Sequence, residues 1–162
     1  MKASIYLGTQ GWIYEGWEGP FYPRKTSSKE MLRLYSRIFN TVEIDSTFYA
    51  IPAKNTVTGW YERTPKDFKF CVKIISEITH KKRLRDVEHA LESFLERIRL
   101  LGEKLGAILI QMPPDFTPAE FSSLHSFLTL LPRDLNFAVE FRDSDWLKDD
   151  RFLEELKAYN VA

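Results

Sequence analysis

The stretch Phe39–Tyr49 reads Phe-Asn-Thr-Val-Glu-Ile-Asp-Ser-Thr-Phe-Tyr, and it decides how the rest of the chain is interpreted. Within it, Val42 and Ile44 alternate with Thr41, Glu43 and Asp45. Successive side chains of a β-strand point to opposite faces, so this segment predicts a strand with one apolar face and one face that carries two carboxylates.

Alternating strand and helix patterns continue along the chain. Further strands are expected at residues 3–9, 68–73, 107–111 and 137–141, and helices at residues 27–38, 55–62, 86–102, 117–132 and 150–159. Ser27 and Glu30 have capping-box spacing, and Pro118 directly after Thr117 is typical of a helix start. Residues 160–162 look like the beginning of a sixth strand. This order predicts right-handed crossovers and a parallel sheet.

The two faces of the predicted strands separate two α/β architectures. In an open doubly wound sheet, helices cover both faces and the central strands are apolar on both sides. Here one face is apolar and the other carries polar groups, which favours a TIM-type (β/α) barrel with an outer ring of helices. The polar face is expected to present Thr41, Glu43, Asp45, Lys69, Cys71, Lys73, Gln111, Glu140 and Arg142.

The length of the chain limits this barrel. A closed eight-fold barrel typically needs about 250 residues, with about 200 as a lower limit, whereas the chain has 162. The expectation is one domain over residues 1–162, an incomplete barrel of about five βα units that lacks its C-terminal strands. Open edges of such a sheet invite self-association, unless further strands or a partner cover them.

Composition indicates a globular protein without a strong global field. Hydrophobic residues make up 44% of the chain, and 23 Lys and Arg residues balance 23 Asp and Glu residues. Nothing therefore draws the whole protein to nucleic acid or to an anionic membrane. No apolar run approaches the roughly 20 residues that span a bilayer. The single cysteine, Cys71, cannot form an internal disulfide, and no signal-peptide core is present, so a cytoplasmic protein is expected.

Short motifs along the chain are similar to those of a known family. They are Gly8-Thr-Gln-Gly-Trp12, Phe21-Tyr-Pro23, Phe39–Tyr49, Thr64-Pro65 with Phe68-Lys-Phe70 and Val72-Lys73, Thr79-His-Lys81, Gln111-Met-Pro-Pro114, and Ala138-Val-Glu-Phe-Arg142 with Trp146. Together they resemble the YecE-like family, domain of unknown function 72. The resemblance implies a TIM-type barrel in a longer domain. This sequence departs from the family by lacking everything after the fifth helix and by having Gln10 where serine is frequent. A relation of the family to xylose isomerase and endonuclease barrels is an analogy of fold.

Polar side chains stand at the carboxyl end of every predicted strand, which is where barrels of this kind carry their working residues. We expect these ends to converge on one mouth with an aromatic and histidine rim. The strand ends are Thr9, Gln10, Glu43, Asp45, Lys73, Gln111, Glu140 and Arg142, and the rim is Trp12, Tyr14, Tyr49, His80 and Trp146.

Three of these residues are candidate catalytic groups. Glu43 and Glu140 can act as a general acid and base, because a shared low-dielectric site pushes their pKa values apart. Lys73 beside a carboxylate can orient a phosphate or carboxylate group. The alternative is an internal layer of ion pairs that Glu43 and Glu140 form with Lys73 and Arg142.

Two further alternatives remain open. His80 with Lys81, Lys82, Arg83 and Arg85 is a concentrated positive segment, which is either a solvated loop or a nucleic-acid contact aided by aromatic stacking. A divalent metal held by Glu43, Asp45, His80 and Glu140 is a second alternative, although no His-x-x-x-His or Cys-x-x-Cys spacing is present.

The leading hypothesis is a barrel enzyme or ligand-binding protein that acts on a phosphate-bearing or carbohydrate-like small molecule. Glu43 and Glu140 would be its acid/base carboxylates, and Lys73 and Arg142 would hold the anion. The alternatives are a non-catalytic nucleic-acid or phosphate-binding module and an inactive fragment of a longer barrel.

Overall fold

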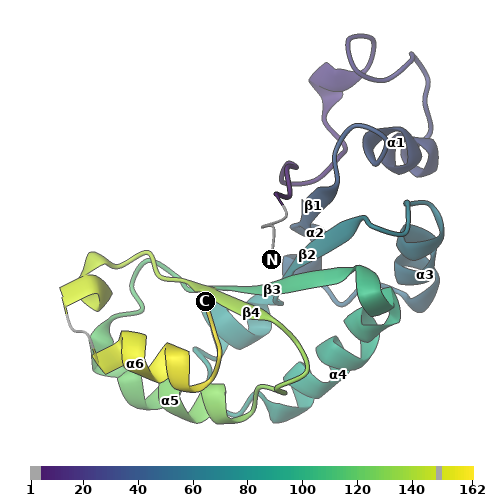
Figure 1. Ribbon diagram of the computed structural model, residues 1–162. Helices are drawn as coiled ribbons and strands as arrows, with labels where there is room; N and C mark the ends of the chain where they lie inside the picture. Colours follow the sequence, from purple (N-terminus) through teal and green to yellow (C-terminus); the bar gives the residue numbers. More distant parts are fainter. Residues whose placement is uncertain (1–4, 149–150) are drawn as a thin grey trace.

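A parallel β-sheet lies at the centre of the fold (Figure 1). The computed structural model describes residues 5–148 and 151–162. Across these residues the sheet has four strands, and their spatial order follows the chain. The strands are β1 (Thr41–Ile44), β2 (Lys69–Lys73), β3 (Leu105–Gln111) and β4 (Phe137–Glu140). All neighbouring strands run parallel, as the alternation of strands and helices predicts.

Helices connect the strands and lie on the outer face of the curved sheet (Figure 1). The α-helices are α1 (Ser28–Tyr35), α2 (Ser46–Tyr49), α3 (Lys54–Glu62), α4 (Glu88–Ile98), α5 (Phe121–Thr129) and α6 (Arg151–Ala158). A π-helical turn, η2, covers Glu77–Lys81. Short 3₁₀ segments are η1 (Glu15–Trp17), η3 (Arg99–Lys104), η4 (Pro118–Glu120) and η5 (Ser144–Lys148).

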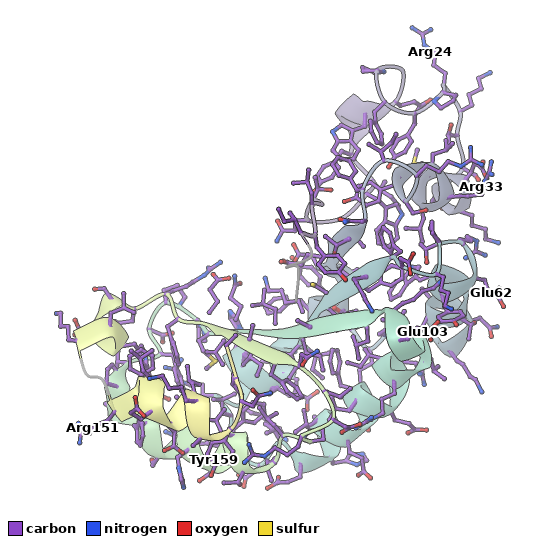
Figure 2. The ribbon with its side chains drawn as sticks, in the orientation of Figure 1. Arg24, Arg33, Glu62, Glu103, Arg151 and Tyr159 are labelled. Atoms are coloured by element: carbon purple, nitrogen blue, oxygen red, sulfur yellow. The ribbon has the colours of Figure 1, made fainter. Side chains whose placement is uncertain are left out.

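The strands have the two different faces that their alternation predicts. Burial alternates along β1, where Val42 and Ile44 are fully buried while Thr41 and Glu43 are half-buried. The buried face belongs to a single hydrophobic core with the helices, and Figure 2 shows side chains filling the space between the two layers. Register places Glu43 beside Cys71, and Gln111 beside Glu140, on the opposite face. The polar face of the sheet is therefore continuous across the strands.

Several local signals are confirmed by the helix boundaries. Ser27 caps α1, since its Oγ accepts a hydrogen bond from the Glu30 N–H at 3.4 Å. The expected helix at residues 55–62 is present as α3. By contrast, the predicted end of this helix at residue 38 is wrong, because α1 ends at Tyr35 and Ile38, which is 69% exposed, lies beyond it.

The predicted first strand is wrong in its described part, residues 5–9; residues 3–4 lie outside the described residues. This segment runs beside β1, but the pairing is reduced to one parallel bridge between Gln10 and Glu43. Further back, the Asn40 side chain replaces a strand partner, accepting from the Leu7 N–H at 2.7 Å and donating to the Ile5 carbonyl at 2.9 Å.

The connection between β2 and α4 also differs from expectation. The prediction starts this helix at residue 86, but α4 begins at Glu88 after Val87. Asp86 has φ +51°, and Arg83 and Leu84 also have positive φ. The chain therefore turns sharply here, and the helix cannot extend back to Asp86.

The last described residues return to the sheet. The expected helix at residues 150–159 is present as α6, with residue 150 outside the described residues. Val161 forms a parallel bridge with Phe137, and the Val139 N–H donates to the Ala162 carbonyl at 2.8 Å. Residues 161 and 162 thus lie along the outer edge of β4, as expected for the start of a further strand. No helix within residues 5–148 and 151–162 is long and apolar enough to cross a bilayer.

Candidate functional site at the carboxyl ends of the strands

Glu43 lies on the polar face of β1, at the point where the N-terminal segment pairs with this strand. The Gly11 N–H donates to the Glu43 carbonyl at 2.8 Å, and the Glu43 N–H donates to the Thr9 carbonyl at 3.0 Å. The Gln10 amide donates to Oε1 of the Glu43 carboxylate at 3.3 Å.

The surroundings of Glu43 raise the pKa of its carboxyl group above the ordinary value. Burial is the main cause, and the nearby carboxylates of Asp45 and Glu140 act in the same direction. The hydrogen bond from Gln10 and the positive charge of Lys73 oppose the shift. Glu43 therefore takes up a proton more readily than a solvated glutamate, which is the property that a general acid/base needs.

Lys73 and Asp45 meet at the ends of the two neighbouring strands. Lys73 is only 9% exposed, and its Nζ lies 3.6 Å from Oδ1 of Asp45 and 4.7 Å from the centre of the Phe48 ring. That separation from Asp45 is beyond hydrogen-bond distance, and Oδ1 is itself buried without a hydrogen bond. Within the described residues, the Lys73 ammonium has an ion-pair partner and an aromatic neighbour, but no hydrogen-bond acceptor.

Glu140 is oriented by neighbours from two directions. Gln111, its register partner on β3, donates through Nε2 to Oε1 of Glu140 at 2.8 Å. Arg142 approaches the same oxygen, with Nε at 3.6 Å. These contacts fix the carboxylate at the end of β4. The Glu140 carboxylate is the weakest of the influences that raise the pKa of Glu43, so the ends of β1 and β4 lie within electrostatic range of each other.

His80 reaches the site from the π-helical turn after β2. Its Nδ1 shares a hydrogen bond with the Thr79 hydroxyl at 2.8 Å, and its ring meets the Phe48 ring edge to face with centroids 4.9 Å apart. Burial lowers the pKa of His80, and the cations of Lys73 and Arg142 lower it further. These influences favour the neutral form of the imidazole.

The short helix α2 contributes two residues that sequence patterns do not single out. Phe48 packs between the Lys73 ammonium and the His80 ring. The buried Thr47 hydroxyl lies 2.7 Å from the carbonyl oxygens of both Ile44 and Lys73, and so ties the end of β1 to the end of β2. Both residues belong to the motif Phe39–Tyr49, but nothing in their spacing predicts these contacts.

The remaining predicted ligand-binding residues have different surroundings. Tyr49 is 81% exposed beside Phe48. Thr9 is held by Tyr35, whose hydroxyl oxygen accepts from the Thr9 N–H at 2.8 Å. Trp12 is buried against Trp60, and Trp146 is 1% exposed. The structure therefore does not place the two tryptophans on an exposed rim.

Tyr14, by contrast, lies within electrostatic range of Glu43 and Asp45. The pKa of its phenol is raised first by burial, then by Tyr35 and these two carboxylates. The negative charges of Glu43 and Asp45 therefore act on the phenol of Tyr14, which belongs to the N-terminal loop.

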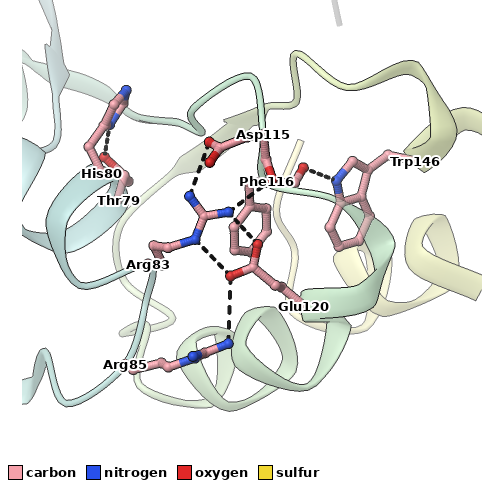
Figure 3. Close-up of polar contacts among 8 residues, drawn as sticks. All are labelled: Thr79, His80, Arg83, Arg85, Asp115, Phe116, Glu120 and Trp146. Atoms are coloured by element: carbon pink, nitrogen blue, oxygen red, sulfur yellow. Dashed lines mark hydrogen bonds and ion pairs between the residues drawn. The ribbon is translucent and has the colours of Figure 1, made fainter.

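Most cations of the basic segment are engaged by neighbouring groups (Figure 3). Arg83 donates to both carboxylate oxygens of Glu120 and to the side chain and main chain of Asp115. Arg85 lies 3.6 Å from the same Glu120 carboxylate, and Lys82 donates to the Asp86 carbonyl at 2.8 Å. The segment thus fastens the β2–α4 connection to the start of α5.

Metal ligation has no ready-made cluster in the described part of the chain. Across residues 5–148 and 151–162, no three His, Cys, Asp or Glu side chains form a group that could hold a metal ion.

Three comparisons place this geometry among known proteins. A family model described as "Protein of unknown function DUF72" matches residues 6–162. The UPF0759 protein YecE of Escherichia coli is 36% identical over 138 residues, which cover 85% of this chain and 48% of that protein. The UPF0759 protein YunF of Bacillus subtilis is 34% identical over 166 aligned positions, covering 98% of this chain and 57% of that protein.

Solved structures of the family have the same fold. A DUF72 family protein from Thermotoga maritima superposes with a TM-score of 0.80 at 29% identity, covering 96% of this chain and 62% of that one. A DUF72 family protein from Enterococcus faecalis gives a TM-score of 0.72 at 26% identity, covering 84% and 58%. The chain spans about half the length of the curated relatives that it matches. The family match over residues 6–162 and these relatives show that the chain belongs to the DUF72, or YecE-like, family.

Proposed function

We propose that the polar face of the sheet is part of the inner wall of a TIM-type barrel, and that its mouth binds a phosphate-bearing or carbohydrate-like small molecule. The half-buried polar face, the helices on the outer face and the greater length of the relatives support this architecture. Strands beyond those of this chain would complete the wall.

The observation that carries the proposal is the surroundings of the Lys73 ammonium group. Lys73 is 9% exposed, and among the described residues its ammonium has the Asp45 carboxylate at 3.6 Å but no acceptor within hydrogen-bond distance, so it can still take a hydrogen-bond acceptor from a ligand. A phosphate or carboxylate oxygen supplies that acceptor and matches the charge. The Phe48 ring beside Nζ keeps the ammonium in place.

The carboxylates around Lys73 suit a ligand that also carries hydroxyl groups. Glu140, held by Gln111, is a fixed acceptor for a ligand O–H, and its second oxygen has no hydrogen-bond partner among the described residues. Glu43, with its raised pKa, would exchange a proton with the bound molecule. These roles give a barrel enzyme that performs proton transfer on an anionic polyol.

A small molecule is preferred to nucleic acid because the candidate phosphate-contacting arginines already have partners. Arg83 and Arg85 both bind Glu120, and the formal net charge of the chain is zero. Neutralising several DNA or RNA phosphates would require these ion pairs to break. A nucleic-acid module predicts that Lys81→Met weakens binding to an oligonucleotide, whereas the present proposal predicts no such binding.

Calorimetric titration of the chain with ribose 5-phosphate, ribose and inorganic phosphate tests the proposal. We expect ribose 5-phosphate to bind, Lys73→Met to weaken it at least about 10-fold, and Lys66→Met, at an exposed lysine before β2, to leave it unchanged. Glu43→Gln should retain binding, because its role is proton transfer. Failure of all three compounds to bind, or equal affinity of the parent and Lys73→Met, would contradict the proposal.

A further inference from the structure

A cavity lies between α1 and α3, and none of the strand-end carboxylates and cations is among its lining residues. It has a volume of about 510 Å³, within the range of small-molecule sites. Its lining includes Trp12 from the N-terminal loop, Ser28 and Lys29 from the first turn of α1, and Asn55, Trp60 and Arg63 from α3 and its end. The two helices stand next to each other at one end of the sheet in Figure 1.

The charges around this cavity are of one sign. Lys29 and Arg63 are its charged lining residues, and no carboxylate is among the residues that line it. Neither cation has an ion-pair partner in the described part of the chain. The cavity therefore favours an anion, in contrast to the strand-end site, where each cation has a carboxylate neighbour.

Helix starts add hydrogen-bond donors to these charges. In α3 the N–H groups of Thr56 and Val57 both bond to the Ala53 carbonyl, and Ala53 has no side chain that could cap the helix. The first-turn N–H groups of Lys54 and Asn55 thus have no acceptor within the helix. Ser28 and Lys29 hold the same positions in α1, whose cap Ser27 serves Glu30. Two helix N-termini beside one cavity favour negative charge.

Trp12 is a buried aromatic residue of the cavity lining. Its side chain lines the cavity and is only 9% exposed, and its indole Nε1–H is buried without an acceptor. Trp146 shows the usual arrangement, since its Nε1–H donates to the Phe116 carbonyl at 2.7 Å (Figure 3). Trp12 also meets Trp60 edge to face, with centroids 6.0 Å apart, which provides an aromatic wall.

Arg63 is held in position by the surface of its own helix. A Cβ built on Gly59 would lie 2.2 Å from an Nη atom of Arg63, so the end of the Arg63 side chain occupies the space beside the glycine. A larger residue at position 59 would push it away. The guanidinium thus lies where a larger side chain at position 59 would stand, and it has no ion pair among the described residues.

We propose that this cavity binds a small organic phosphate, with the phosphate between Arg63, Lys29 and the two helix starts, and the organic group against Trp12 and Trp60. The site is separate from the strand-end site and does not depend on the function proposed for that site.

Nuclear magnetic resonance of the ¹⁵N-labelled chain tests whether the cavity binds an organic phosphate. Phenyl phosphate is the probe, and inorganic phosphate, which has the anionic group alone, is the comparison. The indole N–H signals report directly, and Trp12→Phe assigns the Trp12 signal while removing the N–H and part of the aromatic surface. We expect phenyl phosphate to shift the Trp12 signal and leave the Trp146 signal in place. Inorganic phosphate should bind more weakly, because it lacks the aromatic group.

Variants separate this site from the strand-end site. Arg63→Met should weaken phenyl phosphate binding at least 10-fold, and Trp12→Phe several-fold. Arg37→Met, at an exposed arginine beyond α1, and Lys73→Met should each leave the affinity unchanged. An unshifted Trp12 signal at saturating probe, or full affinity in folded Arg63→Met, would overturn the proposal. Loss of affinity in Lys73→Met with none in Arg63→Met would assign the probe to the strand-end site instead.

Discussion

The Gln10 amide donates a hydrogen bond to the Glu43 carboxylate at 3.3 Å, across the single bridge that joins the N-terminal segment to β1. This bond favours the charged form of Glu43, but burial and two neighbouring carboxylates outweigh it, so the pKa of Glu43 is raised. Gln10 therefore moderates the acidity of the candidate acid/base.

A pH dependence of stability follows from this raised pKa. The ordinary pKa of a glutamate is 4.5, and the pKa of Glu43 in the folded chain is higher. The folded chain therefore holds the Glu43 proton more tightly than the unfolded chain does. The contribution of Glu43 to stability is therefore largest at low pH and is lost as the pH rises through the folded-state value. Glu43→Gln has no such loss, so its stability relative to the parent should increase from pH 4 to pH 7 in urea unfolding. A stability difference that stays constant with pH would contradict the raised pKa.

Removing the hydrogen bond between Gln10 and Glu43 should shift the pKa of the Glu43 carboxyl group. In Gln10→Ala the carboxylate loses a donor to its charged form, so the pKa of Glu43 should rise further. Carbon-detected magnetic resonance of the side-chain carboxyl groups would follow it directly. A titration that moves downward in Gln10→Ala would show that Gln10 does not stabilise the ionised form.

The ion pairs of Arg83 should contribute measurably to stability. Its guanidinium makes hydrogen bonds to Glu120 and Asp115 and lies over the Phe116 ring at 5.6 Å. A lysine keeps the charge but cannot reproduce the forked geometry, so Arg83→Lys should lower the free energy of unfolding by about 1–3 kcal/mol. Arg85→Lys is the control, because the Arg85 side chain is 61% exposed, and it should cost about 0.5 kcal/mol or less. Equal effects of the two changes would mean that Arg83 does not fasten the connection.

The close approach of Gly8 to β1 gives a third stability test. A Cβ on Gly8 would lie 2.0 Å from the Thr41 carbonyl oxygen, which is main chain and cannot swing aside. Gly8→Ala should therefore destabilise the chain by about 1–3 kcal/mol in urea unfolding. Gly16→Ala provides the matched control, since a Cβ there meets nothing within 4 Å. An unchanged unfolding midpoint in Gly8→Ala would indicate that the N-terminal segment is not packed on β1.

Sequence patterns predict the regular elements well where short-range periodicity determines them. The alternating segment Phe68–Lys73 contains β2, which covers Lys69–Lys73. The capping-box spacing at Ser27 marks the start of α1. The first strand fails because pairing depends on the partner as well as on local pattern. Asn40, far along the chain, satisfies the main chain of residues 5 and 7 through its side chain.

The candidate site is predictable only in part for the same reason. Strand-end position identifies Glu43, Lys73 and Glu140, because parallel strands bring their carboxyl ends together. Aromatic residues in loops carry no signal that separates rim from core, and Trp146 is in the core at 1% exposure. The cavity between α1 and α3 has no local signature either, since its lining residues come from three separate segments.

Gly59 links helix stability and ligand binding in opposite directions. Alanine is a better helix former than glycine, and the atoms that a Cβ would meet first belong to the flexible end of Arg63. Gly59→Ala should therefore raise the free energy of unfolding by up to about 1 kcal/mol. The same Cβ displaces the guanidinium from the cavity, so phenyl phosphate affinity should fall several-fold while stability increases.

A double variant shows whether the loss of affinity acts through Arg63. If Gly59→Ala weakens binding only by moving the guanidinium, it should have no further effect on affinity in an Arg63→Met background, although its gain in stability should persist. Titration of the parent, both single variants and the double variant gives the coupling between the two positions. Additive losses of affinity would mean that Gly59 faces the ligand itself. Coupled losses would assign it the role of positioning Arg63, which no sequence pattern around either residue predicts.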